Sequence, residues 1–372
     1  MSVSESEGWN IMILISRWSR AHTFLGGTLS HHCLFSFLSP TPTQFNSLQS
    51  NSNSGVMIPI PQYPIYSATI DRFGGKKVGY AMDETKGWSA SLEELERSLA
   101  EAKSNGINVN SFVLINPGNP TGQVLTPDAI QDVVKFCSKH NLVLLADEVY
   151  QENVYEAKKE FYSCKRAARD AGLDKDACKI EMVSFHSTSK GLFGECGRRG
   201  GYMEMVGFDP AIRDQMYKLA SSHLCANVPG QVMTSIMVNG PKKGDISYEM
   251  HEEEKKTIFD GLCKRAKIVG DGFNKIPGLS CEPVQGSMYC FPKVDMPAKA
   301  IKAAEEQGLT PDTLYAVSLL ENAGICVVPA SGFGQEKGRF GFRTTFLPSE
   351  EEMVLVVDKV RKHHGEFCKK YE

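Results

Sequence analysis

The sequence lacks the patterns that mark membrane, secreted and nucleic-acid-binding proteins. In 372 residues no apolar run is long enough to cross a bilayer, and the short run Ile11–Ile15 follows two glutamates instead of the basic residues of a secretory signal. The net charge is −3, and lysine and arginine form no stripe that would bind nucleic acid. We therefore expect no membrane partner and no nucleic-acid partner.

Several chemical signatures are also missing. The 11 cysteines are odd in number and contain no C-x-x-C pair, which indicates reduced thiols in a reducing compartment and not a disulfide framework. No G-x-x-x-x-G-K, H-E-x-x-H or G-x-S-x-G pattern occurs, which argues against a phosphate-binding loop, a zinc protease and a serine hydrolase. The adjacent pair His31 and His32 lies in a segment of unusual composition, so we expect no metal site.

That segment is the first 55 residues, which differ from the rest of the chain. No Asp, Glu, Lys or Arg occurs between Arg20 and Asp71, and a serine-rich stretch such as residues 47–55 is typical of a disordered linker. Two interpretations stay open. One is an organelle transit peptide, and the other is a divergent or wrongly assigned N-terminus without a folded role. We expect residues 1–55 to be a disordered leader.

From residue 56 the pattern is that of an α/β protein. Thr126 and Pro127 predict the start of a helix, because threonine is a good N-cap and proline fits the first helical position. Short apolar runs predict buried strands at residues 112–115, 142–146, 182–185 and 201–206. Strands that alternate with helices imply a mostly parallel sheet covered by helices on both faces. We assign this sheet to a large domain, residues 56–245.

The last third of the chain predicts a smaller α+β domain, residues 246–372. A long charged helix is expected at Tyr248–Phe273. Weaker strands are expected near residues 287–291 and 339–345.

Three polar segments follow successive predicted strands of the large domain. They are NPGNPTG at Asn116–Gly122, DEVY at Asp147–Tyr150 and STSK at Ser187–Lys190. Because ligands of open α/β sheets bind beyond the carboxyl ends of the strands, we expect the three segments to converge. With the Arg-containing loop that runs on to Gly201, they supply a lysine, a carboxylate, a phenol, an amide and cations. Those groups are needed to hold pyridoxal phosphate and carry out amine chemistry with it.

Each of these side chains has a chemical and an ordinary interpretation. Lys190 is a candidate Schiff-base lysine or a surface lysine, and Asp147 is a partner for a pyridinium N–H or a helix N-cap. Tyr150 lies one helical turn on if a helix starts at Asp147, and would reach the ring's phenolate oxygen; otherwise it is a core tyrosine. Asn119 could donate to the same oxygen or be a turn residue. Ser187 and Arg199 could bind phosphate. Taken together and in this order, the ordinary interpretations are poor.

These residues and the segments around them resemble a known family. Most of the chain, from about Gly55 to the C-terminus, is similar to fold-type I, class I pyridoxal-phosphate-dependent aminotransferases, and specifically to alanine aminotransferases. The segments that carry the resemblance are Pro59–Ala68, Asn116–Gly122, Leu144–Asn153, Ser184–Tyr202, Ser331–Gly334 and Phe342–Thr345.

The resemblance implies a role for each candidate residue. Lys190 would bind pyridoxal 5'-phosphate and move the substrate Cα proton, and Asp147 would pair with the pyridine nitrogen. Asn119 and Tyr150 would contact the phenolic oxygen, and Ser187 and Arg199 the phosphate, with Arg198 as a rival for Arg199. The substrate's α-carboxylate would be held by Arg343, beside Asn119, while Tyr63 would stack on the ring.

The resemblance also implies a reaction and an assembly. L-Alanine and 2-oxoglutarate would give pyruvate and L-glutamate in two ping-pong halves, catalysed by a homodimer with its site at the subunit interface. Such enzymes occur in the cytoplasm, which we expect here, and in mitochondria, the alternative.

The sequence departs from the family pattern in several places. A Gly-Ala-Ser turn that would cradle the phosphate, a tyrosine that reaches the partner subunit and an N-terminal arm are all expected upstream of Pro59, and none occurs there. Ala330 stands where the family usually has glycine, and Gly341 where it often has histidine. The alternative function is therefore a catalytically impaired aminotransferase-like fragment, or a dimerisation partner that lacks the phosphate-binding turn. A third interpretation keeps the cofactor and changes the reaction.

Overall fold

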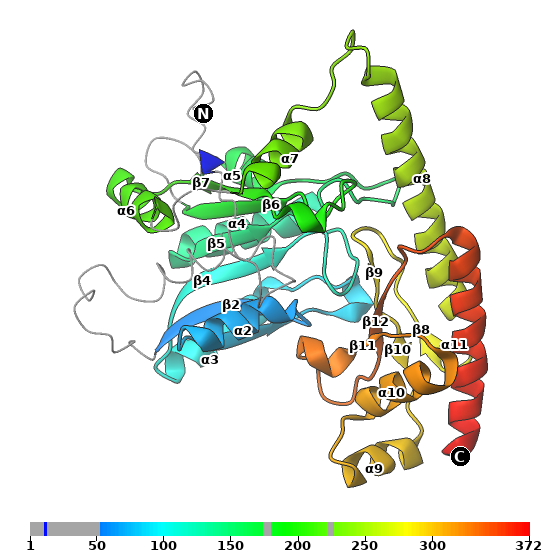
Figure 1. Ribbon diagram of the computed structural model, residues 1–372. Helices are drawn as coiled ribbons and strands as arrows, with labels where there is room; N and C mark the ends of the chain where they lie inside the picture. The colour runs from blue at the N-terminus through cyan, green and yellow to red at the C-terminus, as the bar shows by residue number, and fades with distance from the viewer. Residues whose placement is uncertain (1–10, 13–52, 174–179, 222–226) are drawn as a thin grey trace.

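A seven-stranded sheet in the order β1-β7-β6-β5-β4-β2-β3 forms the centre of the larger part of the molecule (Figure 1). The computed structural model describes residues 11–12, 53–173, 180–221 and 227–372. Strands β3, β2, β4, β5 and β6 are parallel, while β7 is antiparallel to β6 and β1 to β7. The strands are β1 (Ile11–Met12), β2 (Ser54–Ile60), β3 (Lys76–Ala81), β4 (Asn108–Ile115), β5 (Val143–Asp147), β6 (Met182–Ser187) and β7 (Gly201–Val206). The prediction of a mostly parallel sheet is confirmed.

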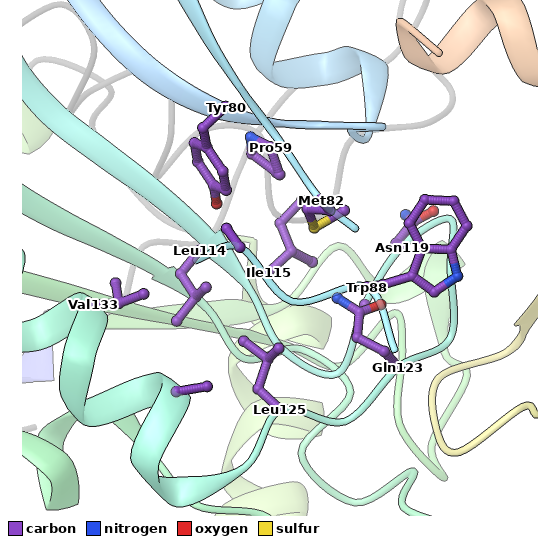
Figure 2. A pocket seen from close by; sticks show the side chains of 13 residues that line it. Pro59, Tyr80, Met82, Trp88, Leu114, Ile115, Asn119, Gln123, Leu125 and Val133 are labelled. Atoms are coloured by element: carbon purple, nitrogen blue, oxygen red, sulfur yellow. The ribbon is translucent and has the colours of Figure 1, made fainter. Parts of the chain in front are cut away.

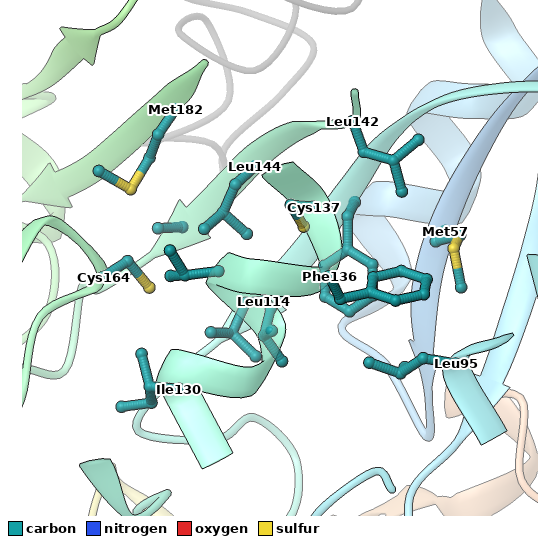
Figure 3. Packing of buried hydrophobic residues seen from close by; sticks show 14 of the residues in the cluster. Met57, Leu95, Leu114, Ile130, Phe136, Cys137, Leu142, Leu144, Cys164 and Met182 are labelled. Atoms are coloured by element: carbon teal, nitrogen blue, oxygen red, sulfur yellow. The ribbon is translucent and has the colours of Figure 1, made fainter. Parts of the chain in front are cut away.

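Helices cover both faces of this sheet, because each central strand is apolar on both sides. In β5, Leu144 and Ala146 face one helical layer, while Val143 and Leu145 face the other. The first layer contains α3 (Leu92–Ser104), α4 (Pro127–His140) and α5 (Cys164–Asp170), and Figure 3 shows its packing around Phe136 and Cys137. The second layer includes α2 (Pro64–Arg72) and α6 (Pro210–Ser221). Helix α7 (Val228–Val238) follows α6.

Helix α4 begins as the sequence predicts. The Thr126 side chain accepts a hydrogen bond from the Ala129 N–H at 3.3 Å, and Pro127 occupies the first turn. The helix ends at Asn141, which takes the left-handed conformation with φ 54°. This fixes the angle at which the chain enters β5, and with it the position of Asp147.

The C-terminal part has its own apolar core, built from residues between Leu262 and Phe367. Two small antiparallel sheets, β11-β12-β9 and β10-β8, lie beside the paired helices α8 and α11 (Figure 1). The elements are α8 (Tyr248–Phe273), β8 (Leu279–Ser280), β9 (Tyr289–Cys290), β10 (Lys293–Val294), α9 (Ala298–Glu306), α10 (Pro311–Ala323), β11 (Val328–Pro329), β12 (Phe342–Thr345) and α11 (Glu350–Lys370). A smaller α+β domain is confirmed, and its boundary at residues 245 and 246 stays a prediction.

In the part of the chain that the structure describes, three short 3-10 helices join these elements: η2 (Glu84–Lys86), η3 (Cys196–Arg198) and η4 (Ala330–Phe333). Within the described ranges, no helix is long and apolar enough to cross a membrane. The eight cysteines of those ranges are all free thiols. Apart from β1 and the residues from 53 on, the predicted leader lies outside the described residues.

The two weaker strands of the C-terminal part are shorter than predicted. Only Tyr289–Cys290 and Phe342–Thr345 are paired as named strands, because Ser287 takes a left-handed conformation with φ 61° and breaks the first one. Directly before the second strand, Gly341 forms an isolated antiparallel bridge with Lys293. A Cβ atom there would lie 2.2 Å from the Pro292 carbonyl oxygen, so the backbone leaves no room for a side chain.

Candidate active site

The three polar segments meet at one edge of the large sheet. Strands β4, β5 and β6 are parallel neighbours, and Asp147 lies in register between Ile115 and Phe185. The three strands end at nearly the same level of the sheet. The NPGNPTG loop, the Asp147 turn and the Ser187–Lys190 loop therefore lie beside one another. This is the convergence that the strand order implied.

Asp147 ends β5 and is 7% exposed. Its Oδ2 accepts a hydrogen bond from the Tyr66 hydroxyl at 2.7 Å, and its Oδ1 accepts the Val149 N–H at 3.5 Å. Both donors are neutral, and among the described residues no cation pairs with this carboxylate. Burial is the main cause that raises the pKa of Tyr66 well above its ordinary value, and the negative charge of Asp147 is the next largest cause. The Tyr66 phenol therefore keeps its proton and stays a hydrogen-bond donor. A buried carboxylate held only by neutral donors has the capacity to accept a cationic N–H.

The chain turns after Asp147 and does not form a helix. Gln151 N–H donates to Glu148 O, and Asn153 N–H donates to Tyr150 O, so the chain makes two successive turns. The condition of a helix starting at Asp147 is therefore not met, and the interpretation of Asp147 as a helix N-cap is wrong. The turns bury Tyr150, whose hydroxyl donates to the Tyr289 hydroxyl at 3.1 Å.

Lys190 lies three residues beyond the end of β6 and is half-buried. Its Nζ donates to the Tyr289 hydroxyl at 3.4 Å. In the preceding loop, Ser187 Oγ accepts the Ser189 N–H at 3.0 Å, which curls the chain at the end of the strand. The Ser189 hydroxyl is buried and has no hydrogen-bond partner. An unsatisfied buried hydroxyl beside Lys190 is a donor that a bound anionic group would satisfy.

The two arginines of the following loop differ in conformation. Arg199 has φ 57° and ψ 41°, the left-handed region, and its Nη1 donates to the Cys196 carbonyl at 2.8 Å. Partial burial lowers the pKa of Arg199. Arg198 has its side chain 54% exposed and forms an ion pair with Glu195 at 3.5 Å. Among the described residues, neither guanidinium forms a hydrogen bond with Ser187 or Lys190.

Arg343 reaches the large domain from β12. Its guanidinium carbon lies 4.3 Å from the ring centroid of Tyr289 and 4.8 Å from that of Phe333. Its Nη1 donates to Asn119 Oδ1 at 3.0 Å, which joins two predicted site residues that are 224 positions apart. The buried Nε has no partner. Arg343 is therefore fixed by ring faces and one amide, with donor capacity left for a carboxylate.

A glycine holds the Asn119 loop close to β9. Gly122 has φ +73°, and a Cβ atom there would lie 2.8 Å from the Tyr289 carbonyl oxygen. Only glycine combines this conformation with so close an approach. The loop therefore brings Asn119 to the small domain through its backbone.

Tyr63 precedes α2 and is half-buried beside the same group of residues. Burial raises the pKa of Tyr63, and the nearby Lys190 charge is the largest influence in the opposite direction. Asp147 and Arg343 also act on this phenol, which places Tyr63 near three other predicted site residues.

Sequence reasoning missed Tyr66, Tyr289 and Phe333. Tyr66 follows Tyr63 by three residues on α2, and this helical spacing was the available signal. Phe333 lies inside the Ser331–Gly334 segment of the resemblance. Tyr289 stands in a strand of two residues, and its partners lie 99 and 139 positions away, so no local pattern marks it.

A small cavity adjoins the NPGNPTG loop, and Asn119 is the one predicted site residue that lines it. Figure 2 shows Asn119 and Gln123 near Trp88, with apolar side chains such as Leu114 and Val133 around the rest. About 20 Å³ of this cavity is open to water, which is room for roughly one molecule. None of Lys190, Asp147 and Arg343 lines it.

Comparison with known proteins agrees with this geometry. The sequence model of the family described as "Aminotransferase class I and II" matches residues 43–360. The chain belongs to this family. It is 48% identical over 321 residues to "Alanine aminotransferase 2" of Panicum miliaceum, an alignment that covers 86% of this chain and 66% of that protein.

Other relatives of this aminotransferase have related names. "Probable alanine aminotransferase, mitochondrial" of Dictyostelium discoideum is 48% identical over 87% of this chain and 61% of its own length. "Glutamate--glyoxylate aminotransferase 1" of Arabidopsis thaliana is 44% identical over 88% of this chain and 68% of its own length. The chain thus spans about two thirds of the length of each of these curated relatives.

Solved structures confirm the fold. "Alanine aminotransferase from Pyrococcus furiosus" superimposes with a TM-score of 0.74 at 24% identity, covering 96% of this chain and 76% of that one. The fold-type I architecture predicted from the sequence is therefore confirmed.

Proposed function

We propose that this aminotransferase uses pyridoxal 5'-phosphate to convert L-alanine and 2-oxoglutarate into pyruvate and L-glutamate. One observation carries the proposal: Lys190, Asn119 and Arg343, from three remote segments, belong to one contact network at the end of the parallel strands. The names of the relatives at 48% identity support L-alanine as the amino donor.

The residues of the site fit the cofactor. Asp147 is a buried carboxylate with neutral donors only, which suits a protonated ring nitrogen. Ser189 has a buried, unpartnered hydroxyl next to the lysine, which suits an anionic group. When bound, pyridoxal 5'-phosphate would supply an aldehyde that takes up the amino group and a ring that accepts electron density.

Each side chain would then have one task. Lys190 would hold the cofactor, Asp147 would accept the ring N–H, and the Tyr63 ring would cover one face. Asn119 would donate through its NH₂ to the phenolic oxygen, since its Oδ1 already accepts from Arg343, and Tyr150 would contact the same oxygen. Ser187 and Arg199 would bind the phosphate.

The left-handed backbone of Arg199 favours it over Arg198 as the phosphate ligand. A non-glycine residue in this region costs about 1–2 kcal/mol, and such conformations concentrate at binding sites. Arg198 has ordinary helical geometry and an acidic neighbour, Glu195.

Proton transfer would depend on two residues. Arg343 would bind the α-carboxylate of the amino acid in a bidentate manner and so place the Cα hydrogen. Lys190 would take the Cα proton as general base and later give up a proton as general acid. Both substrates carry an α-carboxylate, so one clamp would serve both halves of the reaction.

Pyruvate production tests this function. Cofactor-loaded protein with L-alanine and 2-oxoglutarate should form pyruvate, and Lys190→Ala should abolish it. Arg343→Lys should raise KM for both substrates by about 10- to 100-fold, because lysine cannot form the bidentate pair. Soluble, cofactor-loaded protein that forms no pyruvate would refute alanine aminotransferase activity and favour the impaired-partner alternative.

Glutamate–glyoxylate transamination is the second candidate function, because a relative of that name is 44% identical. The α-carboxylate clamp at Arg343 would serve either pair of amino donor and acceptor. A panel with glyoxylate against 2-oxoglutarate as amino acceptor separates the two. A higher kcat/KM for L-glutamate with glyoxylate than for L-alanine with 2-oxoglutarate would replace the first proposal.

A homodimer with the site at its interface is part of the proposal. Helix α7 presents Val228, Val232 and Ile236 along one side, and they are 65%, 54% and 44% exposed. Their spacing of four residues makes a continuous apolar strip, which a partner subunit would cover. Light scattering should show a dimer that Val232→Glu weakens; a monomer at micromolar concentration contradicts this assembly.

We propose that the protein acts in the cytoplasm, with mitochondria as the alternative because some relatives are named as mitochondrial.

A further inference from the structure

Tyr289 contacts both ends of the proposed reaction centre through different atoms. Its hydroxyl accepts from Lys190 Nζ at 3.4 Å, and its ring faces the Arg343 guanidinium at 4.3 Å. We propose that Tyr289 is a positioning residue that sets the separation between the proton-transferring lysine and the carboxylate-binding arginine. This inference rests on the proposed function, since the roles of Lys190 and Arg343 belong to it.

The surroundings of Tyr289 make it rigid enough for this task. The side chain is 6% exposed, and its backbone pairs with Thr345 of β12, the strand that also carries Arg343. Gly122 packs against its carbonyl oxygen, and the Tyr150 ring meets its ring edge-on at 84°. A tyrosine confined on all these sides has little freedom in its two side-chain torsions.

The hydroxyl is suited to a lysine that changes its protonation state. The Tyr150 hydroxyl donates to Tyr289 Oη at 3.1 Å. Tyr289 keeps its own proton available in this arrangement, and also if Tyr150 donates to the cofactor's phenolic oxygen instead. When Lys190 is charged, its ammonium donates to Tyr289; when Lys190 is neutral, Tyr289 can donate to the lone pair of Nζ. The same partner thus holds the nitrogen in both states without gaining or losing a proton.

The ring performs a separate task at the arginine. Tyr289 and Phe333 both present ring faces to the Arg343 guanidinium, at 4.3 and 4.8 Å. Ring faces hold the cation without using its N–H groups, so these remain for Asn119 and a substrate carboxylate. An amino acid carries its carboxylate and its reactive hydrogen on the same carbon, so the clamp and the base must keep one fixed separation.

Two substitutions at Tyr289 separate the hydroxyl from the ring. Tyr289→Phe keeps the ring and should lower kcat about tenfold, with KM for L-alanine changed less than about twofold. It should also shift the pH dependence of kcat and of the bound-cofactor absorbance, since Lys190 loses its partner. Tyr289→Leu removes both groups and should raise KM about tenfold in addition.

Phe333→Leu is the matched control, because the Phe333 ring faces Arg343 but has no polar group that could hydrogen-bond to Lys190. It should raise KM while leaving both pH profiles as in the wild type. Tyr289→Phe retains a buried ring, so it keeps the test valid if Tyr289→Leu does not fold.

Two results would overturn the inference while the proposed function stands. One is an active wild type whose kcat and pH profiles are unchanged by Tyr289→Phe. The other is a Tyr289→Phe variant that raises KM as much as Tyr289→Leu does. A cofactor-loaded wild type that forms no pyruvate refutes the proposed function itself, a separate outcome.

Discussion

Replacing Arg199 by glycine should weaken cofactor binding while leaving the stability of the apoprotein nearly unchanged. The substitution removes a left-handed backbone cost of about 1–2 kcal/mol. Against this, the unfolded chain gains entropy worth about 0.4–1 kcal/mol, and the bond to the Cys196 carbonyl, about 0.5–1 kcal/mol, is lost. The free energy of unfolding of the apoprotein should therefore stay within about 1 kcal/mol of the wild type.

Cofactor affinity should fall in the same variant. One charge-assisted hydrogen bond to phosphate is worth about 1.5–3 kcal/mol, so Kd for pyridoxal 5'-phosphate should rise about 10- to 150-fold. Urea unfolding of the apoprotein and absorbance titration with the cofactor measure the two quantities.

Arg198→Gly is the matched control for this experiment. Arg198 sits in helical geometry, so glycine there should cost about 1 kcal/mol of stability and leave Kd unchanged. The reasoning is refuted if Arg198→Gly weakens cofactor binding as much as Arg199→Gly, or if Arg199→Gly leaves Kd unchanged.

Three further predictions concern stability. Gly341→Ala places Cβ 2.2 Å from the Pro292 oxygen and should lower the free energy of unfolding by about 2 kcal/mol or more. Gly365→Ala, in α11 with open space around it, is the control and should raise the free energy of unfolding slightly. Equal effects of the two substitutions in denaturant titrations would contradict the steric argument. Burial raises the pKa of Glu148 from 4.5 to about 7, so its contribution to stability is present below pH 4.5 and is lost as pH rises through 7, by roughly 3 kcal/mol. Glu148→Gln should flatten this decline in urea titrations between those pH values, and an unchanged slope would exclude Glu148 as its source. Tyr66→Phe removes a bond to a buried carboxylate and should cost about 1.5–3 kcal/mol, more than Tyr80→Phe, whose hydroxyl donates to a neutral carbonyl; the reverse order in the same assay would contradict it.

The strands of the large sheet and the polar residues at their ends could be predicted from the sequence, because the patterns that mark them are local. Thr126 with Pro127 marked the start of α4, and apolar runs that end in Asp147 or lead to Lys190 marked the strands that carry them. The order of parallel strands then determined which loops meet.

The contacts between the two domains could not be predicted in the same way. Tyr289 has no periodic neighbours, and its strand is two residues long, since the left-handed Ser287 precedes it. The bond between Arg343 and Asn119 spans 224 positions and depends on how β12 packs against the Gly122 loop. The sequence left open whether a helix starts at Asp147, and the answer depends on backbone bonds within residues 148–153, which close two turns.

Identification of the residue that bonds the cofactor tests the central claim most directly. Protein loaded with pyridoxal 5'-phosphate is reduced with borohydride, which makes a lysine linkage permanent, and is then digested and examined by mass spectrometry. The account predicts the added pyridoxyl group on Lys190, the lysine that contacts Tyr289, and none in a Lys190→Ala variant that still folds. A group on a different lysine, or no added group in wild-type protein at saturating cofactor, would contradict it.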